Sequence, residues 1–520
     1  MRYPSFTQMA LVGLCFCPLF SARAQTTAPA TPAAAPAPAA KPAAPFPGYI
    51  NQYARAADPS LKAWDFGVAV RLREEVKNGA GTTDAGSNWD FSERPQDDNE
   101  NEYQLIRIMP RIGYNNPGVF SFLVEARSSY SLNDERYQPT APGYNLPEND
   151  GPLDLHQVYV TVGGGKESPL SLKAGRQELV YGDQRLVGHA RWLNVPRTFD
   201  GAKLRYDTPT LAVDLFSAGV VYTKDGALNQ SNFQDLFSGL YVTLPKLSKT
   251  DVVEGYLFNR HVSRAIVTDD WSEIPAPGRN PAPQDLYNLG VRVKSKPNAR
   301  GPWDYTVEAD YQFGNRTAVF PATPPAAALI APELDQSAYA VIAQLGYTWP
   351  KGTPWSPRLA VYASIASGDS NATDTKSGTF QNLFPSNHLL YGAMDLTGLQ
   401  NARDLRFSLT TKPSAKLTLN LEVNLQSLDT TDDYWYNAAG APRNFTGAAV
   451  GSGKGYRINP SYGSTLGQEV DLLAGYAVTP GALLEAGYSH YFRGDYIKDS
   501  LAAVGSKDAD YFFLQFTLNL

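Results

Sequence analysis

Apolar and polar positions alternate over the last eleven residues of the chain, 510–520. From residue 512 to residue 520 every second side chain is large and apolar, and three of the four between them are polar. A repeat of two predicts a β-strand with one apolar face, and this length is enough for a tilted strand to cross a bilayer. Because backbone groups in lipid must be hydrogen-bonded, such a strand needs a neighbour on each side within a closed barrel.

The same alternation begins at 65–75 and recurs along the whole chain. In that first segment Phe66, Val68, Val70 and Leu72 take the outward positions, so it can pair with the last strand and close a ring. We predict about 18 strands, near residues 65–75, 103–114, 119–130, 154–162, 168–177, 199–207, 210–219, 238–244, 251–260, 285–295, 303–313, 337–348, 357–368, 403–412, 416–427, 467–478, 482–492 and 510–520.

The connections between these segments alternate between short and long. Short ones such as 163–166, 207–209 and 479–481 contain the Gly and Pro typical of tight turns. Transmembrane barrels have short periplasmic turns and long extracellular loops. The sequence therefore predicts an all-β fold, a transmembrane antiparallel β-barrel of about 18 strands with both termini in the periplasm. A soluble protein of stacked β-sandwiches is the alternative, but it would not need one apolar face on each strand.

The N-terminal region is expected to lie outside this barrel. Residues 1–24 are typical of a secretory signal peptide, with Arg2 before an apolar core at 9–20 and small residues at the cleavage site. Residues 25–60 begin with an Ala/Pro-rich run and are expected to form a periplasmic tail, too short for the plug domain of an energy-coupled receptor. The barrel is expected over 61–520, where no run of 18 apolar residues predicts a membrane helix.

Composition adds three limits to this picture. Aromatic residues make up 12% of the chain, as the interfacial girdles of a barrel require. Both cysteines, Cys15 and Cys17, lie in the signal peptide, so the mature chain has neither disulfides nor thiol chemistry. Cleavage also removes Arg2 and Arg23 but no acidic residue, which changes the formal net charge from −6 to −8 and disfavours nucleic-acid binding.

Charged residues inside the strands must face the lumen if the outward positions are apolar. The first half of the chain supplies mainly bases at these positions: Arg71, Arg73, Arg107, Arg111, Arg127, Lys203 and Arg205, together with Glu125. The second half supplies mainly acids: Glu308, Asp310, Glu422, Glu469 and Asp471, together with Arg292 and Arg406. One interpretation is a set of ion pairs that stiffens and wets the wall. The other is a surplus of arginine that attracts an anionic solute, since rings of Arg or Lys select for anions.

Arginine is most concentrated in the long connection after the fifth strand. Arg176, Arg185, Arg191 and Arg197 fall within 22 residues, between glycines and aromatics. A loop of this kind, folded into the lumen, would narrow the pore and place guanidinium groups at the constriction, where they match carboxylates bidentately. Alternation from Leu170 would turn Arg176 outward, so we expect a β-bulge at Gly175 that turns it inward.

Several motifs in and beyond this connection are similar to those of a known family. They are Gly175, Arg176, Gln177 and Glu178; Tyr181 to Asp183 with Arg185; Trp192; Arg197 to Gly201; and the blocks 387–395, 401–405, 432–436 and 467–471. Over about residues 60 to 520 the chain resembles the alginate-export outer-membrane porins. The resemblance implies an 18-stranded monomeric barrel whose arginine-lined, electropositive constriction passes an anionic uronate polymer.

The sequence predicts neither a metal site nor a catalytic site. The five histidines, His156, His189, His261, His388 and His490, show no metal-ligand spacing, so we expect no metal and no cofactor. A barrel esterase would need a serine and a histidine side by side. Ser489 and His490 are adjacent in a predicted strand, which points them to opposite faces, so an enzyme is not expected.

These observations predict a passive channel in the bacterial outer membrane, surrounded by lipid and lipopolysaccharide. We expect an anionic saccharide, such as an alginate-like uronate polymer or oligomer, to pass an arginine-lined constriction. Export of a polymer would require periplasmic components, whereas uptake of small anions would not. A general or small-carboxylate uptake porin is the main alternative, and an outer-membrane barrel esterase is a weaker one.

Overall fold

The computed structural model describes most of the region predicted to form the barrel. The described residues are 48–79, 89–93, 100–134, 148–165, 168–223, 226–263, 283–317, 332–371, 373–388, 390–438, 440, 442–443 and 456–520. The predicted signal peptide and the Ala/Pro-rich run up to residue 47 lie outside them.

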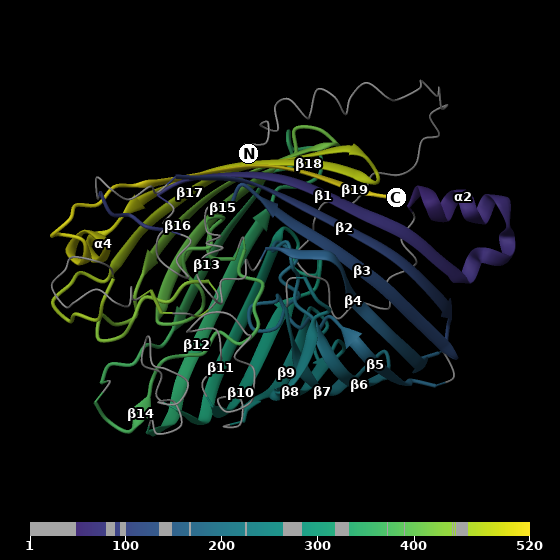
Figure 1. Ribbon diagram of the computed structural model, residues 1–520, viewed down its shortest axis with the longest axis horizontal. Coiled ribbons are helices and arrows are strands. Elements are labelled where there is room, and N and C mark those ends of the chain that lie inside the picture. The colour runs from purple at the N-terminus through teal and green to yellow at the C-terminus, as the bar shows by residue number, and fades with distance from the viewer. Residues whose placement is uncertain are drawn as a thin grey trace. The chain divides into compact units, whose positions relative to one another are not determined.

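Eighteen long strands form the wall, in the positions that the alternation predicts (Figure 1). They are β1 (Trp64–Asn78), β2 (Glu100–Asn116), β3 (Phe120–Leu132), β4 (Asp150–Gly163), β5 (Leu170–Gln177), β6 (Phe199–Asp207), β7 (Ala212–Tyr222), β8 (Gln230–Leu244), β9 (Asp251–Val262), β10 (Gln284–Ser295), β11 (Trp303–Thr317), β12 (Glu333–Thr348), β13 (Arg358–Ala366), β15 (Ala402–Thr411), β16 (Leu417–Ser427), β17 (Thr465–Thr479), β18 (Ala482–Arg493) and β19 (Ala509–Asn519). A two-residue strand, β14 (Lys376–Ser377), pairs in parallel with β12.

The wall closes because β1 is hydrogen-bonded on both sides. Val70 is paired with Ile108 of β2 and with Leu518 of β19, both antiparallel. Each remaining wall strand pairs antiparallel with the wall strand before it and the one after it. The predicted closure of the last strand on the first is therefore confirmed, and residues 69–78 of β1 are hydrogen-bonded to β19, as a strand in lipid requires.

Side chains alternate between a buried inner face and an exposed apolar outer face. In β12, for example, Ala338, Ala340 and Ile342 are buried, whereas Tyr339 and Val341 are exposed. Aromatic rings also gather near the short turns, where Trp303 and Tyr347 lie 4.8 Å apart, edge to face, as expected for an interfacial girdle.

Short helices lie before the first strand of the wall and before the last one. The α2 helix (Tyr49–Ala57) and the 3₁₀ helix η1 (Pro59–Ala63) occupy a stretch that the sequence assigned to the tail, and α4 (Asp495–Ser500) precedes β19. Asn51 fixes α2 to the barrel because its amide donates to Asp65 at 2.5 Å and accepts from the backbone N–H of Phe66 at 2.8 Å. In the described part of the chain, no helix has the length and apolar character of a membrane span.

Two connections fold into the lumen instead of remaining outside it. The first inner loop, residues 178–198, connects β5 to β6 and has buried apolar residues such as Leu179 and Tyr181. The second inner loop, residues 378–400, lies between β14 and β15 and buries Phe384 and Tyr391. Both belong to hydrophobic clusters that include inward-facing rings of the wall, so the lumen is partly filled by packed side chains.

Candidate pore constriction

The two inner loops are hydrogen-bonded to each other across the lumen. Backbone N–H groups of Gly188 and Phe384 donate to the carbonyls of Phe384 and Leu186, both at 2.8 Å, in a short parallel pairing. The N–H of Ser386 donates to the carbonyl of Gln184 at 2.9 Å. Backbone pairing of this kind makes the two loops one unit, which we expect to narrow the passage.

An aromatic cluster attaches the first inner loop to one side of the wall. The ring of Tyr181 stacks on Tyr241 at 4.6 Å and on Phe216 at 5.4 Å between ring centroids. Phe384 of the second inner loop meets Phe237 of the same wall at 4.8 Å. Because these rings are buried, the solute path must lie elsewhere in the lumen.

Asp183 adds an ionic attachment on that side. Its carboxylate lies 2.5 Å from Nη2 of Arg292 and 2.9 Å from Nζ of Lys294 on β10. Burial opposes ionisation of Asp183, but Arg292 and Lys294 hold its pKa below the usual value. Arg185 was predicted to line the constriction, but it is only 4% exposed. Its Nη1 lies 3.5 Å from the hydroxyl of Tyr391 in the second inner loop.

The opposite end of the first inner loop is held by three arginines of β1 and β2. Arg71 donates to the carbonyls of Arg191 and Trp192, both at 2.9 Å, and Arg73 donates to Trp192 at 2.8 Å. Arg107 donates to the carbonyls of Arg191 at 3.0 Å and Leu193 at 2.7 Å. A carbonyl carries no net charge, so these bonds orient the guanidinium groups without neutralising them.

The three arginines differ in their ionic partners. Arg73 pairs with Glu75 at 2.7 Å and lies 3.8 Å above the Trp192 ring, which in turn stacks on His388 at 3.6 Å. Within the described residues, neither Arg71 nor Arg107 has a carboxylate within 4 Å. Glu148 also lies at this end, where it accepts the backbone N–H of Asn194 at 2.5 Å. Among the described residues, Arg71, Arg73, Arg107 and Arg191 still outnumber Glu75, Glu148 and Glu178, so positive charge is in excess.

Arg191 is the most exposed of the four arginines predicted for the constriction, with 44% of its side chain accessible. Its Nε and Nη2 donate to Glu178 at 3.0 and 2.9 Å, and Glu178 chiefly raises the pKa of Arg191. Burial raises the pKa of Glu178, but Arg191 and the hydrogen-bonded His156 together outweigh burial and hold that pKa below its usual range. Burial also lowers the pKa of His189 to about 4, so His189 is neutral.

Arg197 holds the two inner loops together. Its Nη1 donates to the carbonyls of Gly188 at 3.1 Å and Pro385 at 2.9 Å. Burial, with a smaller contribution from Arg260, lowers the pKa of Arg197 to about 10. Arg197 therefore stays charged at neutral pH beside the junction of the loops.

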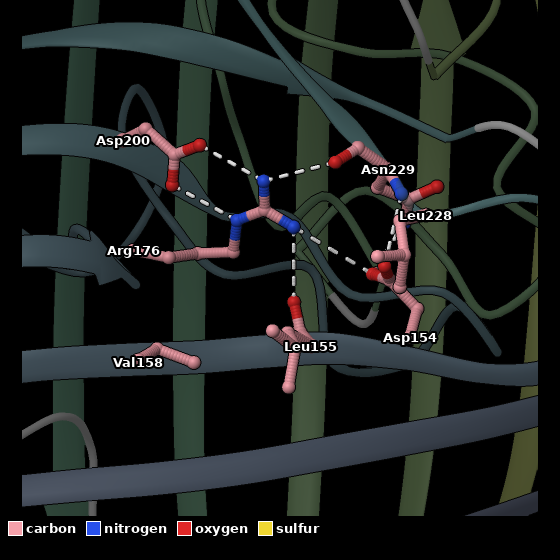
Figure 2. A pocket seen from close by; sticks show the side chains of 7 residues that line it. All are labelled: Asp154, Leu155, Val158, Arg176, Asp200, Leu228 and Asn229. Atoms are coloured by element: carbon pink, nitrogen blue, oxygen red, sulfur yellow. Dashed lines mark hydrogen bonds and ion pairs between the residues drawn. The ribbon is translucent and has the colours of Figure 1, made fainter.

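Arg176 is not where the sequence predicted. The pairing of β5 with β4 and β6 continues from Leu170 to Gln177 without a register shift, so the expected bulge at Gly175 is wrong. Arg176 lies on the outward face with Leu170, and its Nε and Nη2 each donate to Asp200 at 2.9 Å (Figure 2). Gly175 has a φ of 122°, and a Cβ there would lie 2.2 Å from the Val158 carbonyl oxygen, which explains the glycine.

The remaining predicted bases are paired with acids of neighbouring strands. Arg111 meets Asp65 at 3.0 Å, Lys203 and Arg205 meet Asp214 at 3.5 and 2.8 Å, Arg406 meets Glu422 at 3.3 Å, and Arg127 pairs with Asp150. For these residues the structure matches the ion-pair interpretation of the wall rather than an unpaired surplus.

The predicted acidic partners do not orient the four loop arginines directly. Glu308 and Asp310 accept from the Tyr256 hydroxyl at 2.7 and 2.9 Å, and Asp471 accepts from Asn424 at 3.1 Å. Glu469 accepts the backbone N–H of Met394 at 2.7 Å, so it supports the second inner loop instead. Glu125 accepts from Gln157 at 3.1 Å.

Sequence reasoning missed Lys173 and Trp192 as side chains of this region. Lys173 lies on the inner face of β5, with Nζ 3.5 Å from the centre of the Tyr159 ring. Alternation from the outward Leu172 could have identified it. The stacking of Trp192 between Arg73 and His388 depends on contacts between distant segments, and nothing local in the sequence reports it.

No group of three or more His, Cys, Asp or Glu side chains in the described segments could hold a metal ion. Ser489 is buried, whereas the neighbouring His490 is partly exposed and its Nδ1 lies 2.8 Å from Asp510. The two side chains therefore lie on opposite faces of β18.

Comparison with known proteins gives a family match and a set of similar folds. A family model described as alginate export matches residues 64–509. Solved structures of similar fold include OpdQ of Pseudomonas aeruginosa (10% identity, 88% of this chain and 98% of that chain covered, TM-score 0.52) and a BenF-like porin from Pseudomonas fluorescens Pf-5 (12%, 88% and 99%, 0.51). The outer membrane protein OpdK of Pseudomonas aeruginosa is a third (13%, 88% and 98%, 0.50). No curated protein matched the chain.

Proposed function

Because the chain belongs to the alginate-export family, whose barrel places it in the bacterial outer membrane as a channel, we propose that it conducts anionic saccharides. The solute class is a uronate polymer or oligomer, which carries one carboxylate per sugar. Transport is passive diffusion through the wet part of the lumen beside the first inner loop. A channel of this kind is a transporter rather than an enzyme.

One observation carries this proposal, namely the excess of guanidinium charge around the turn 191–193. Arg71 and Arg107 reach this turn from β1 and β2 and bind only neutral oxygens within hydrogen-bond distance in the described residues. Arg191 projects from the same turn and is partly exposed. Charge held in a narrow lumen with low-dielectric walls focuses the electric potential, so a passing carboxylate is favoured over a cation.

The bases closer to a carboxylate contribute less to this selectivity. A guanidinium and a carboxylate in contact have nearly no net field at a distance, so Arg111, paired with Asp65, offers a natural comparison with Arg107. Both lie on β2 and both face the lumen, four residues apart. They therefore make a matched pair for a test.

The test is the reversal potential of Arg107→Gln and Arg111→Gln channels in planar bilayers under a salt gradient. We expect Arg107→Gln to reduce the anion-to-cation permeability ratio several-fold, because it removes an uncompensated charge. Arg111→Gln should change the ratio less, and in the same salt both should keep the single-channel conductance within about a factor of two of wild type. Equal effects of the two substitutions, or none, would refute the assignment.

A second candidate function is uptake of small carboxylates. It is favoured by the backbone pairing of the two inner loops, which leaves less room for a polymer than for a small solute. Uronate oligomers of increasing length separate the two candidates. Progressive block of the current with length supports the polymer path, whereas block by monomers alone supports the small-carboxylate porin.

A further inference from the structure

The hydrogen-bonded wall is interrupted beside the extracellular half of β4. The ladder between β4 and β5 covers only residues 158–163 of β4, because β5 ends at Gln177 and the chain turns into the lumen. On that side, the ladder of β4 with the described strands ends at Val158. A strand edge left open at membrane depth is costly unless other groups satisfy it.

Side chains and a backbone bond satisfy this edge in place of a strand. The N–H of Gly226 donates to the carbonyl of Gly151 at 3.1 Å. The Asn229 side chain donates to Asp150 and Asp154, both at 2.8 Å, and its backbone N–H donates to Asp154 at 2.9 Å. Arg176 donates to the carbonyl of Leu155 at 3.0 Å and to that of Asn229 at 3.0 Å. We call Asp150, Asp154, Leu155, Arg176 and Asn229 the seam. Side-chain bonds can be exchanged one at a time, whereas a β-ladder opens cooperatively.

The seam lies within the apolar band of the outer surface. Arg176 and Asp200 share the outward face with Leu172 and Leu204, which are 47% and 39% exposed on the periplasmic side of the pair. On the extracellular side, Leu153 is 56% exposed. An ion pair at such a depth is expensive in lipid and usually marks a functional place rather than a structural one.

A chain of polar contacts connects the seam to the lumen. Asp154 lies 3.7 Å from Arg176 on the outer side and 3.7 Å from Arg127 on the inner side. Nη1 of Arg127 is 3.0 Å from Nδ1 of His156, and Nε2 of His156 is 3.0 Å from Glu178 of the first inner loop. The wall is therefore polar through its full thickness at this place.

A cavity of about 310 Å³ opens at the seam. Leu155, Val158 and Leu228 form its apolar part, and Arg176 and Asp200 lie among its polar groups (Figure 2). A pocket with an apolar rim and a polar base suits a small amphipathic molecule better than an ion or a sugar. Its size is enough for a molecule of about one or two aromatic rings.

From these four observations we propose that the seam is a lateral portal. Small amphipathic molecules that enter the lumen from outside leave it through the seam, between β4 and the connection from β7 to β8, and reach the outer leaflet. We call Arg176 the latch because its hydrogen bonds hold the seam closed. This route is separate from the ion path beside the turn 191–193, so it goes beyond the proposed saccharide channel. It requires the opening of these side-chain contacts and of the backbone bond from Gly226 to Gly151, with no covalent step.

Cross-linking tests the portal directly, because the mature chain has no cysteine of its own. Leu155→Cys with Leu228→Cys places two thiols on the same cavity, one on each side of the seam. The readout is the rate at which intact cells expressing the protein take up N-phenyl-1-naphthylamine, a small uncharged probe that fluoresces in lipid. We expect cross-linking by a short bis-thiol reagent with a reducible linker to lower uptake to the level of cells without the protein, and reduction to restore it.

The matched control joins two strands across an intact ladder. Val160 and Ala174 lie opposite each other on the outward face of β4 and β5, and both are replaced by cysteine in the control. Cross-linking this pair should leave probe uptake unchanged. If the linked seam, confirmed by gel mobility, takes up probe as fast as the reduced seam, the portal is refuted.

Replacing Arg176, the latch, should change probe uptake in the opposite direction to cross-linking. Arg176→Gln removes the guanidinium that binds the carbonyls of Leu155 and Asn229 across the seam, and it should raise probe uptake several-fold, with the barrel shown intact by its heat-modifiable mobility. Unchanged or lower uptake would contradict the latch. Reversal potentials of the same variant should equal those of wild type, so failure of the portal and failure of anion selectivity are separable.

Discussion

At the residue scale, the exposed charge of Arg191 is set by one buried acid. Glu178 lies beside Arg191 and is more buried than it, so the arginine presents its charge to the lumen while the carboxylate reduces that charge from behind. Three of its oxygen contacts go to Arg191 and one to His156. In the proposed channel, we expect the balance between these groups to set how strongly an anion is attracted at the turn 191–193.

Glu178→Gln should therefore strengthen anion preference, in contrast to the arginine substitutions. Glutamine keeps the size and one acceptor oxygen but removes the negative charge beside Arg191. We expect a larger anion-to-cation permeability ratio from reversal potentials, with little change in the strand content measured by circular dichroism. A fall in the ratio would show that Arg191 needs the ionic partner to face the solute.

Arg176 shows what residue type and spacing cannot decide. The four arginines of 176–197 fall in one motif, yet one lies outside, one is buried, one is exposed and one joins the two loops. Alternation did give the outward position of Arg176, and the expected bulge that overrode it was wrong. The alternation of side chains along β5 predicted the position of Arg176 correctly. The expectation that every arginine of the motif serves one function did not.

At the element scale, the strands were predictable and the loop contacts were not. Strand positions follow from a local repeat of two, which lipid on one side and water on the other impose on each strand separately. The pairing of residues 184–188 with 384–386 joins segments that are about 200 positions apart, and no local pattern records it. Trp192 and Phe384 acquire their roles only through that pairing.

Phe384→Ala tests whether the paired loops limit conduction. The ring contacts Phe199 and Phe237 at 5.1 and 4.8 Å, and its loss leaves a cavity that costs about 3–5 kcal/mol locally. Because the wall does not depend on this ring, the barrel should fold while the loops separate more often. We expect higher single-channel conductance and more frequent current steps in planar bilayers. If the Phe384→Ala barrel is intact and its conductance equals that of wild type, the narrowest point of the pore lies away from the junction of the two inner loops.

At the scale of the whole molecule, a net negative chain contains a local positive region. The formal net charge of the whole chain is −6, but much of the acid in the lumen is paired with wall bases or bonded to hydroxyl and amide groups. The uncompensated guanidinium groups gather where the first inner loop meets β1 and β2. Under the proposed function, selectivity follows from this local arrangement rather than from the net charge.

The reversal potential of the wild-type channel in a planar bilayer under a potassium chloride gradient is the most direct test of the claim that this positive region makes the channel anion-selective. The arrangement of Arg71, Arg107 and Arg191 predicts a preference for chloride over potassium that weakens as salt is raised, since screening shortens the reach of the charges. A preference for potassium at low salt would contradict the account.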